Sequence, residues 1–212
     1  MRRALPLWIL LAALAAPAHA ALDDVWRSVP TGVPADSLGR VLGGLESRTP
    51  PGVGQGEIAY ALGAFHYARG EYVQALAAFE RAGVRLVGEE RLTARYFAGL
   101  SLLAVGAFAE ARPVFDEVAR AGGERSALAK LALAQCWDAA NRPEQAYAEL
   151  RELLAGAPGE AGPAALERFA ELAMRFHRDD EAHAARERLA RDYPRSIEAA
   201  RLPVAAPRSG AR

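Results

Sequence analysis

The sequence predicts an all-α fold, a helical-repeat solenoid of antiparallel helix pairs. Three observations predict it: one segment recurs at a near-constant period, its apolar residues follow helical spacing, and glycine, asparagine or proline separates the copies. The copies are GEYVQALAAFERA (70–82), GAFAEARPVFDEV (106–118), NRPEQAYAELREL (141–153) and HRDDEAHAARERL (177–189). Such units bury their apolar faces against neighbouring units, which favours a continuous stack of short helices.

The second helix of each predicted pair carries an alanine in register. These alanines are Ala75, Ala111, Ala146 and Ala182, at spacings of 36, 35 and 36. Four positions later come Phe79, Phe115 and Leu150, whereas the last copy has Arg186. We expect the alanines to let two backbones approach closely and the larger side chains to fill the seam toward the next pair.

The first helix of each pair is predicted in the apolar stretch that precedes each copy. These stretches are 58–68, 94–104, 129–139 and 165–175, and Gly63, Gly99, Ala134 and Ala170 align within them. A helix of about fourteen residues is roughly 21 Å long and is marginal alone in water. Each helix must therefore pack against its partner and against the next pair.

Glycine, asparagine and proline mark the breaks between helices. Gly70 and Gly106 are expected to adopt the left-handed conformation that ends a helix, and Asn141 is the next-best residue for that position. Pro163 suits the first turn of the fourth pair. Pro113 lies well inside a predicted helix and is expected to kink it.

The repeats resemble tetratricopeptide repeats. The pattern of that family has a Leu-Gly pair, an aromatic residue, a central alanine and a later phenylalanine. It is matched by Leu62, Gly63, Tyr72, Ala75 and Phe79 in the first copy, and by Gly99, Phe108, Ala111 and Phe115 in the second. The early tryptophan is absent, with Ala59, Arg95, Lys130 and Leu166 in its place. The resemblance implies a superhelix of about four helix pairs across residues 56–194.

A narrower resemblance involves the segment ARDYPRSIEAARL and the long period. These features are similar to the repeat domain of the periplasmic Tol-Pal accessory protein and to repeats of outer-membrane assembly lipoproteins. The chain lacks the coiled coil of the former and the lipid-bearing cysteine of the latter. The resemblance implies an envelope compartment and a role in protein interactions.

The segments that flank the repeats are predicted to direct export of the chain and to cover the ends of the array. Residues 1–20 read as a signal peptide, with Arg2 and Arg3 before an apolar run and an Ala-x-Ala site ending at Ala20 or at Ala18. We therefore expect a periplasmic protein without a transmembrane helix in its mature form. The N-terminal extension 21–55 contains a helix predicted over 35–47, with Asp36 or Ser37 as its N-cap, and this helix is expected to cap the array. A short closing helix is expected over 195–202 and a disordered tail over 203–212.

Composition and motifs favour a non-catalytic protein. Basic and acidic residues balance at 26 each, and loss of Arg2 and Arg3 leaves a net charge near −2, which argues against nucleic-acid binding. The only cysteine, Cys136, is expected to be a buried apolar residue. His177 and His183 are placed on different helix faces, which disfavours a shared metal, and the carboxylates 179–181 suit a helix N-terminus. No cofactor motif is present, so we predict no enzyme and no cofactor.

The tetratricopeptide resemblance implies that the first helices line a concave groove that binds a partner. The implied groove residues are Tyr60, Tyr67, Tyr96, Leu100, Leu103, Leu131, Gln135, Asp138, Glu171, Met174 and Arg175. In an alternative interpretation residues 21–48 fold back over the tyrosines and leucines, which then belong to the core.

Two classes of function follow from these features. The leading hypothesis is an interaction scaffold or adaptor of the bacterial envelope that binds a peptide segment or a protein subunit. The alternative is a helical enzyme or accessory domain that acts on cell-wall material, using Glu167 or Glu171. A third hypothesis is self-association through the exposed ends of the array.

Overall fold

A computed structural model describes residues 25, 27, 29 and 33–202. The predicted signal peptide and the predicted disordered tail lie outside the described residues. By its internal contacts the chain divides into two compact units, unit 1 (residues 1–129) and unit 2 (residues 130–212). The described part of the chain contains helices and no strand.

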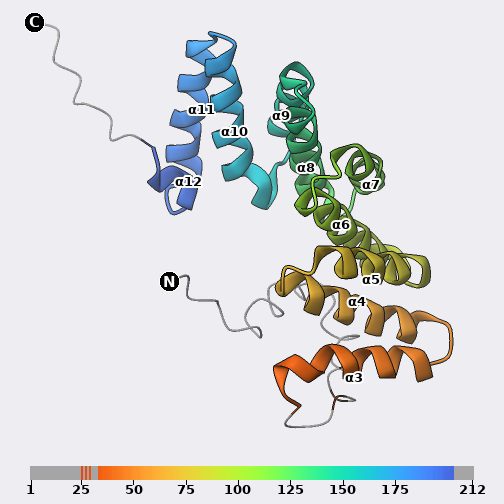
Figure 1. Ribbon diagram of the computed structural model, residues 1–212. Coiled ribbons are helices and arrows are strands. Elements are labelled where there is room, and N and C mark those ends of the chain that lie inside the picture. The colour runs from red at the N-terminus through yellow and green to blue at the C-terminus, as the bar shows by residue number, and fades with distance from the viewer. Residues whose placement is uncertain (1–24, 26, 28, 30–32, 203–212) are drawn as a thin grey trace, which may run out of the picture. The chain divides into compact units, whose positions relative to one another are not determined.

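Short loops join the helices in sequence (Figure 1). The helices are α3 (Ala35–Arg48), α4 (Val53–Ala68), α5 (Tyr72–Arg85), α6 (Gly88–Ala104), α7 (Phe108–Ala121), α8 (Ser126–Ala139), α9 (Pro143–Ala155), the 3-10 turn η1 (Gly159–Ala161), α10 (Gly162–Arg175), α11 (Asp179–Asp192) and α12 (Ile197–Ala200). We call α4, α6, α8 and α10 the first helices of their pairs, and α5, α7, α9 and α11 the second helices. None of the described helices has the length and apolar character needed to cross a membrane.

The predicted register is confirmed. The second helices begin at Tyr72, Phe108, Pro143 and Asp179, which repeats the spacings of the four aligned alanines. Those alanines, Ala75, Ala111, Ala146 and Ala182, are all 0% exposed. They therefore lie against neighbouring helices as the packing argument requires.

The turn inside each helix pair has the same backbone geometry in all four repeats. Its central residue has a positive φ: 76° at Gly70, 80° at Gly106, 55° at Asn141 and 55° at His177. The following residue donates its backbone N–H to a carbonyl five residues back, as in Arg178 N to Ala173 O at 2.9 Å. This bond is the Schellman closure of a helix C-terminus. The prediction that places His177 on a helix face is therefore wrong, because His177 forms the fourth turn.

Aromatic rings fill the seams of unit 1 where the helices come closest. The ring of Phe79 stacks on Phe97 of the next pair with a centroid distance of 5.5 Å. A Cβ atom added to Gly63 would lie 2.7 Å from the Phe79 ring, and one added to Gly99 would lie 2.7 Å from Phe115. The glycines are therefore needed so that each large ring can lie against the first helix of its own pair.

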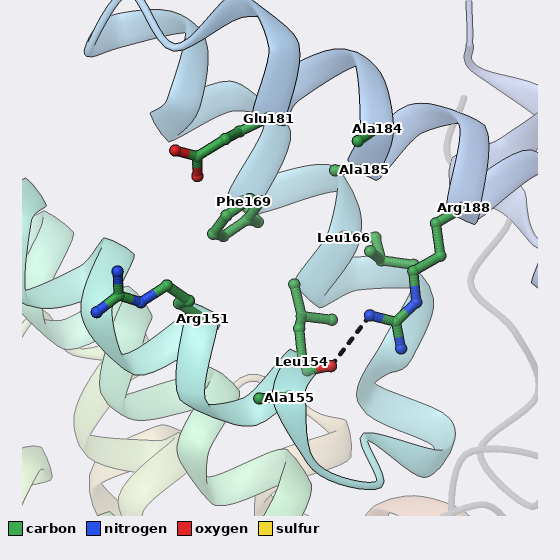
Figure 2. Close-up of a pocket in the computed structure, with 9 residues that line it drawn as sticks. All are labelled: Arg151, Leu154, Ala155, Leu166, Phe169, Glu181, Ala184, Ala185 and Arg188. Atoms are coloured by element: carbon green, nitrogen blue, oxygen red, sulfur yellow. Dashed lines mark hydrogen bonds between the residues drawn. The ribbon is translucent and has the colours of Figure 1, made fainter.

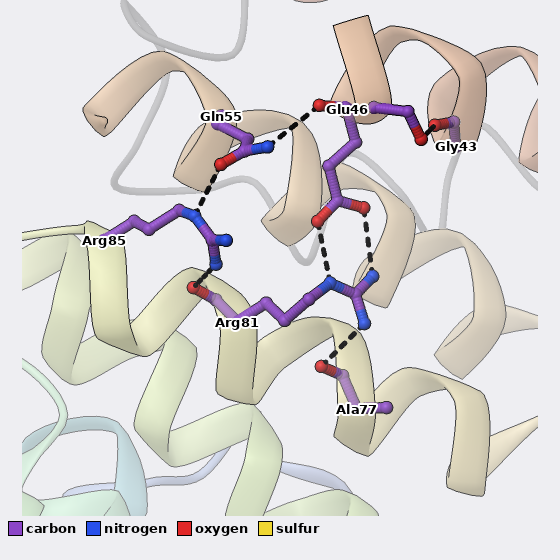
Figure 3. A network of polar contacts seen from close by, with 7 residues as sticks. Gly43, Glu46, Gln55, Ala77, Arg81 and Arg85 are labelled. Atoms are coloured by element: carbon purple, nitrogen blue, oxygen red, sulfur yellow. Dashed lines mark hydrogen bonds and ion pairs between the residues drawn. The ribbon is translucent and has the colours of Figure 1, made fainter. Parts of the chain in front are cut away.

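Helix α3 packs against α4, and a polar network links it to α4 and α5 of the first pair (Figure 3). Leu42 is 0% exposed. Glu46 accepts two hydrogen bonds from the Arg81 guanidinium, at 2.7 and 3.0 Å, and this bidentate pair raises the pKa of Arg81. Gln55 donates to the Glu46 carbonyl and accepts from Arg85. The helix starts after Pro34 without a side-chain cap, so the expected capping by Asp36 or Ser37 is wrong.

Unit 2 has a leucine-rich core. Leu150, Leu166, Leu172 and Leu189 are among its fully buried side chains. Tyr147 of α9 stacks on Phe169 of α10 with a centroid distance of 4.7 Å. Helix α12 contacts α10 and α11, and its N-cap Ser196 accepts a hydrogen bond from the Ala199 N–H.

A proline in α7 and a valine in α5 both lie on the exposed side of their helices. Helix α7 continues through Pro113 from Phe108 to Ala121, and the proline side is exposed, so the missing N–H falls on the outer face. Val73 of α5 is 67% exposed although it is apolar, because it lies opposite the buried Ala75 and Phe79 positions. The apolar face of α5 is therefore narrower than its sequence indicates.

Candidate interaction surfaces

Two tyrosines that were expected to line an open groove are buried in unit 1. Tyr60 is 3% exposed and Tyr96 is 8% exposed. The Tyr60 ring packs edge-on against Phe79 and Phe97, and Tyr96 packs against Phe97 and Phe115. The prediction that these two residues face a partner is therefore wrong for this structure, because the rings of neighbouring helices enclose them.

The other predicted residues of unit 1 remain partly accessible. Tyr67, Leu100 and Leu103 are half-buried. The Tyr67 ring lies edge-on against Tyr72 at 5.3 Å and Phe97 at 6.1 Å. Burial is the main cause that raises the pKa of Tyr67, so its hydroxyl stays protonated and can donate a hydrogen bond. These three side chains are thus partly accessible apolar residues on the first helices of unit 1.

Arg125 is a member of the aromatic cluster that sequence reasoning missed. Its guanidinium carbon lies 5.8 Å from the centroid of Tyr96 and 5.9 Å from that of Phe97. Burial raises the pKa of Tyr60, and the positive charge of Arg125 partly opposes that effect. No motif marks this arginine, since it precedes α8 in a loop and meets the rings only through the fold.

The predicted residues of unit 2 are mostly charged and exposed. Leu131 is buried at 8% exposure, so the groove prediction is wrong for it as well; it holds the same register position as Tyr60 and Tyr96. Gln135, Met174, Glu171 and Arg175 are exposed.

Ion pairs join the charged residues of α8 and α10 into one network. The Asp138 carboxylate accepts hydrogen bonds from Arg168 at 2.9 Å and from Arg175 at 2.8 Å. Arg168 also donates to Glu171 at 2.7 Å. The structure thus brings Asp138, Glu171 and Arg175 together, and Arg168 is the bridging residue that the sequence analysis did not single out.

The other residues that were considered for catalysis or metal binding have structural roles, and several of them form ion pairs with nearby residues. His183 pairs with Glu187 one turn later, and the 179–181 carboxylates lie in the first turn of α11 as expected. Glu167 pairs with Arg201 and Glu171 with Arg168. Cys136 is buried, as predicted. Across the described residues, no group of three or more histidine, cysteine, aspartate or glutamate side chains is arranged to hold a metal.

Comparison with known proteins identifies the fold. No protein-family model matches the chain, and no curated protein sequence matches it. Among solved structures, a thermophilic TPR protein of Thermus thermophilus is similar, with a TM-score of 0.57, 18% identity and coverage of 91% of this chain and 94% of that chain. TPR-like repeats of a Podosopora anserina kinesin light chain protein give a TM-score of 0.61 at 14% identity, covering 88% and 97%.

Two further solved structures extend the comparison. MamA of AMB-1 has a TM-score of 0.58 at 16% identity and covers 92% of this chain and 99% of its own. The Rap conjugation gene regulator of plasmid pLS20, solved with the Phr* peptide, has a TM-score of 0.56 at 13% identity, and the match spans 76% of this chain and 48% of the regulator. The chain therefore has the all-α, helical-repeat fold of tetratricopeptide-repeat proteins.

Proposed function

We propose that the protein is a non-catalytic interaction scaffold of the bacterial envelope, and that its first helices bind an extended segment of a protein partner. The observation that carries the proposal is the charged network of unit 2. Asp138, Arg168, Glu171 and Arg175 project from first helices and hold one another in fixed positions. Charged groups that are already oriented lose little side-chain entropy on binding, which favours recognition.

The accessible residues of unit 1 supply a complementary kind of contact. Tyr67 presents a large ring with a protonated hydroxyl, and Leu100 and Leu103 add apolar area on α6. Aromatic residues with a polar tip are frequent at the energetic centres of interfaces. Unit 1 therefore offers apolar contacts and unit 2 offers charged contacts to a protein partner.

The solved structures support the proposal by analogy of fold. The Rap regulator, which shares the repeat fold, was solved with a bound peptide. Folds host many functions, so the site residues rather than the fold must carry the test. The envelope location rests on the basic and apolar pattern of residues 1–20, and fractionation of cells into periplasm, membranes and cytoplasm tests it directly.

Affinity capture of the full-length tagged protein from its native host tests the interaction surface. Wild type is expected to recover at least one envelope protein. Tyr67→Ala/Leu103→Ala removes two partly accessible apolar side chains from the first helices of unit 1, and Glu171→Ala/Arg175→Ala removes exposed charges of unit 2. Each double variant is expected to recover less of the partner than wild type, because each removes side chains that the first helices of its own unit offer for binding.

The matched control changes exposed apolar residues on a second helix. Val73 and Val84 of α5 are 67% and 83% exposed, so Val73→Ala/Val84→Ala removes two exposed apolar side chains without changing a first helix. This variant should recover the partner like wild type. Equal recovery by all variants, or no specific partner for wild type, would overturn the proposal.

A further inference from the structure

A pocket of about 320 Å³ lies between α9, α10 and α11 in unit 2 (Figure 2). Its wall is apolar and is formed by Leu154, Leu166, Phe169 and three alanines. Arg188 lies at one end of the pocket, and Arg151 and Glu181 lie at the other. This volume is near the lower limit of small-ligand sites, about 300–1,000 Å³, so the pocket has room for a single apolar group.

The corresponding seam of unit 1 is closed by an ion pair. Arg95 of α6 runs along Gly83 of α5 and its guanidinium reaches Glu117 of α7 at 2.9 Å. Arg91 also bonds to Glu117. The long arginine chain thereby fills the space between the two second helices.

The same register position carries the same kind of pair one repeat later. Lys130 and Glu152, which follow Arg95 and Glu117 at a spacing of 35, meet at 2.6 Å. In the fourth repeat, Leu166 takes the place of the cation and Arg188 takes the place of the carboxylate. The seam thus loses its internal ion pair, and the pocket lies beside these two exchanged residues.

Arg188 retains capacity for an anion. Its Nη1 donates to the Leu154 carbonyl at 3.0 Å, and its Nε lies 3.4 Å from Asp192. Asp192 is also bonded by Arg191, and its pKa is lowered mainly by that bond. Among the described residues Nη2 of Arg188 has no hydrogen-bond partner, so its N–H groups remain able to donate to a carboxylate.

The carboxylate at the other end of the pocket is already engaged. Glu181 accepts a hydrogen bond from the Tyr147 hydroxyl and pairs with Arg178. The exposed Arg151 at the same end of the pocket also acts on Glu181, so the negative charge of Glu181 is balanced within unit 2. A basic ligand would find no vacant carboxylate here, whereas an acidic ligand would find two arginines.

We propose that this pocket binds the C-terminal residue of a partner protein, with an apolar side chain of leucine size against Leu166 and Phe169 and the terminal carboxylate on Arg188. The site is separate from the surface proposed above. Leu166 and Phe169 point to one side of α10, and Arg168, Glu171 and Arg175 lie on the opposite side by the 100° rotation per helical residue. Failure of either proposal therefore leaves the other standing.

Fluorescence anisotropy with defined peptides tests the pocket on the full-length protein. The probe is fluorescein-Gly-Ser-Gly-Ala-Leu with a free C-terminal carboxylate. The same peptide with a C-terminal amide should bind about tenfold more weakly, the loss expected for a charge-assisted hydrogen bond. Replacement of the terminal leucine by serine should weaken binding by a similar factor, because the apolar wall then has no partner.

Two pairs of variants assign the binding to the pocket. Ala184 is an exposed residue of the pocket wall, so Ala184→Phe should fill the pocket and abolish binding, while Ala190→Phe changes an exposed alanine of the same helix outside the pocket and should not. Arg188→Gln should remove the preference for the carboxylate over the amide, and Arg191→Gln should keep it. Circular dichroism confirms that each variant is folded.

Three outcomes would overturn the proposal. The first is equal affinity for the carboxylate and the amide peptide on the wild-type protein. The second is unchanged binding in Ala184→Phe. The third is no saturable binding of any peptide in the series.

Discussion

Units 1 and 2 share the same repeat register, but their first helices carry aromatic side chains in unit 1 and charged side chains in unit 2. In unit 1 the first helices carry Tyr60, Tyr96 and Phe97, whose rings close over one another. In unit 2 the first helices carry Asp138 and Arg168, which form an ion pair. The repeat register fixes where helices meet, and the residue placed at each register position then decides whether that position becomes core or surface.

The same contrast holds for the seam between second helices. Unit 1 closes it with Arg95 and Glu117, and unit 2 leaves an apolar pocket beside Leu166 and Arg188. Neither arrangement changes the turns, since all four share a positive φ and the same hydrogen bond. Different side chains at equivalent positions of the repeat can therefore create a pocket while the backbone of the repeat stays the same.

The largest expected difference between register-equivalent residues is at the position of Phe79 and Arg186. Phe79 is 0% exposed between two helix pairs, so Phe79→Ala should lower the free energy of unfolding by about 3–5 kcal/mol. Arg186 lies in the last of the four described pairs, and Arg186→Ala should change the free energy of unfolding by less than about 0.5 kcal/mol. Urea unfolding followed by circular dichroism measures both. Similar losses for the two variants would mean that the fourth pair is covered by another element.

Overpacking of the aligned alanines is the second-largest effect. Ala75→Leu and Ala182→Leu each insert a larger side chain at a position that is 0% exposed, and each should cost about 1–3 kcal/mol. The loss should be greater for Ala75, because the core of unit 1 is rich in rigid aromatic rings, whereas the leucines in the core of unit 2 can change rotamer. A melting temperature unchanged in both variants would contradict this packing of the helix pairs.

The helix frame was open to prediction because its signals are local. Alanines at fixed spacing, and Gly70, Gly106 and Asn141 in the turns, depend only on neighbours along the chain. Burial of Tyr60 was not predictable, because Phe97, which encloses it, is far away in sequence. The pocket could not be predicted for the same reason. The repeat alignment shows Leu166, but the pocket also requires Arg188, which the fold brings beside it.

Substitutions in the turns should change stability by a smaller amount, with opposite signs in the two units. Gly70 has a φ of 76°, so Gly70→Ala should lower the stability of unit 1 by about 1 kcal/mol. His177 adopts a φ of 55° with a side chain present, so His177→Gly should raise the stability of unit 2 by up to about 1 kcal/mol. Thermal unfolding of the two variants provides the measurement. A loss of stability in His177→Gly would show that the imidazole makes a contact worth more than the backbone strain.

The smallest expected effect is a difference in acid sensitivity between the units. The pKa of Glu71 in unit 1 is lowered mainly by its hydrogen bond from Arg69. In unit 2 the pKa values of Glu152, Glu181 and Asp192 are lowered mainly by hydrogen bonds from Lys130, Tyr147 and Arg191. A carboxylate with a lowered pKa stabilises the folded state above its unfolded pKa of about 4, and this contribution is lost as pH falls through the lower folded pKa.

Unit 2 should therefore lose more stability than unit 1 as pH falls below about 4. Hydrogen exchange of the full-length protein, read by mass spectrometry for each helix, resolves the two units in one sample. Glu152→Gln/Glu181→Gln removes two of the three carboxylates and should bring the acid response of unit 2 close to that of unit 1. High salt should reduce the difference in wild type, because these pairs are exposed and therefore screened. Equal protection of both units across the acid range would mean that these ion pairs do not contribute to the stability of unit 2.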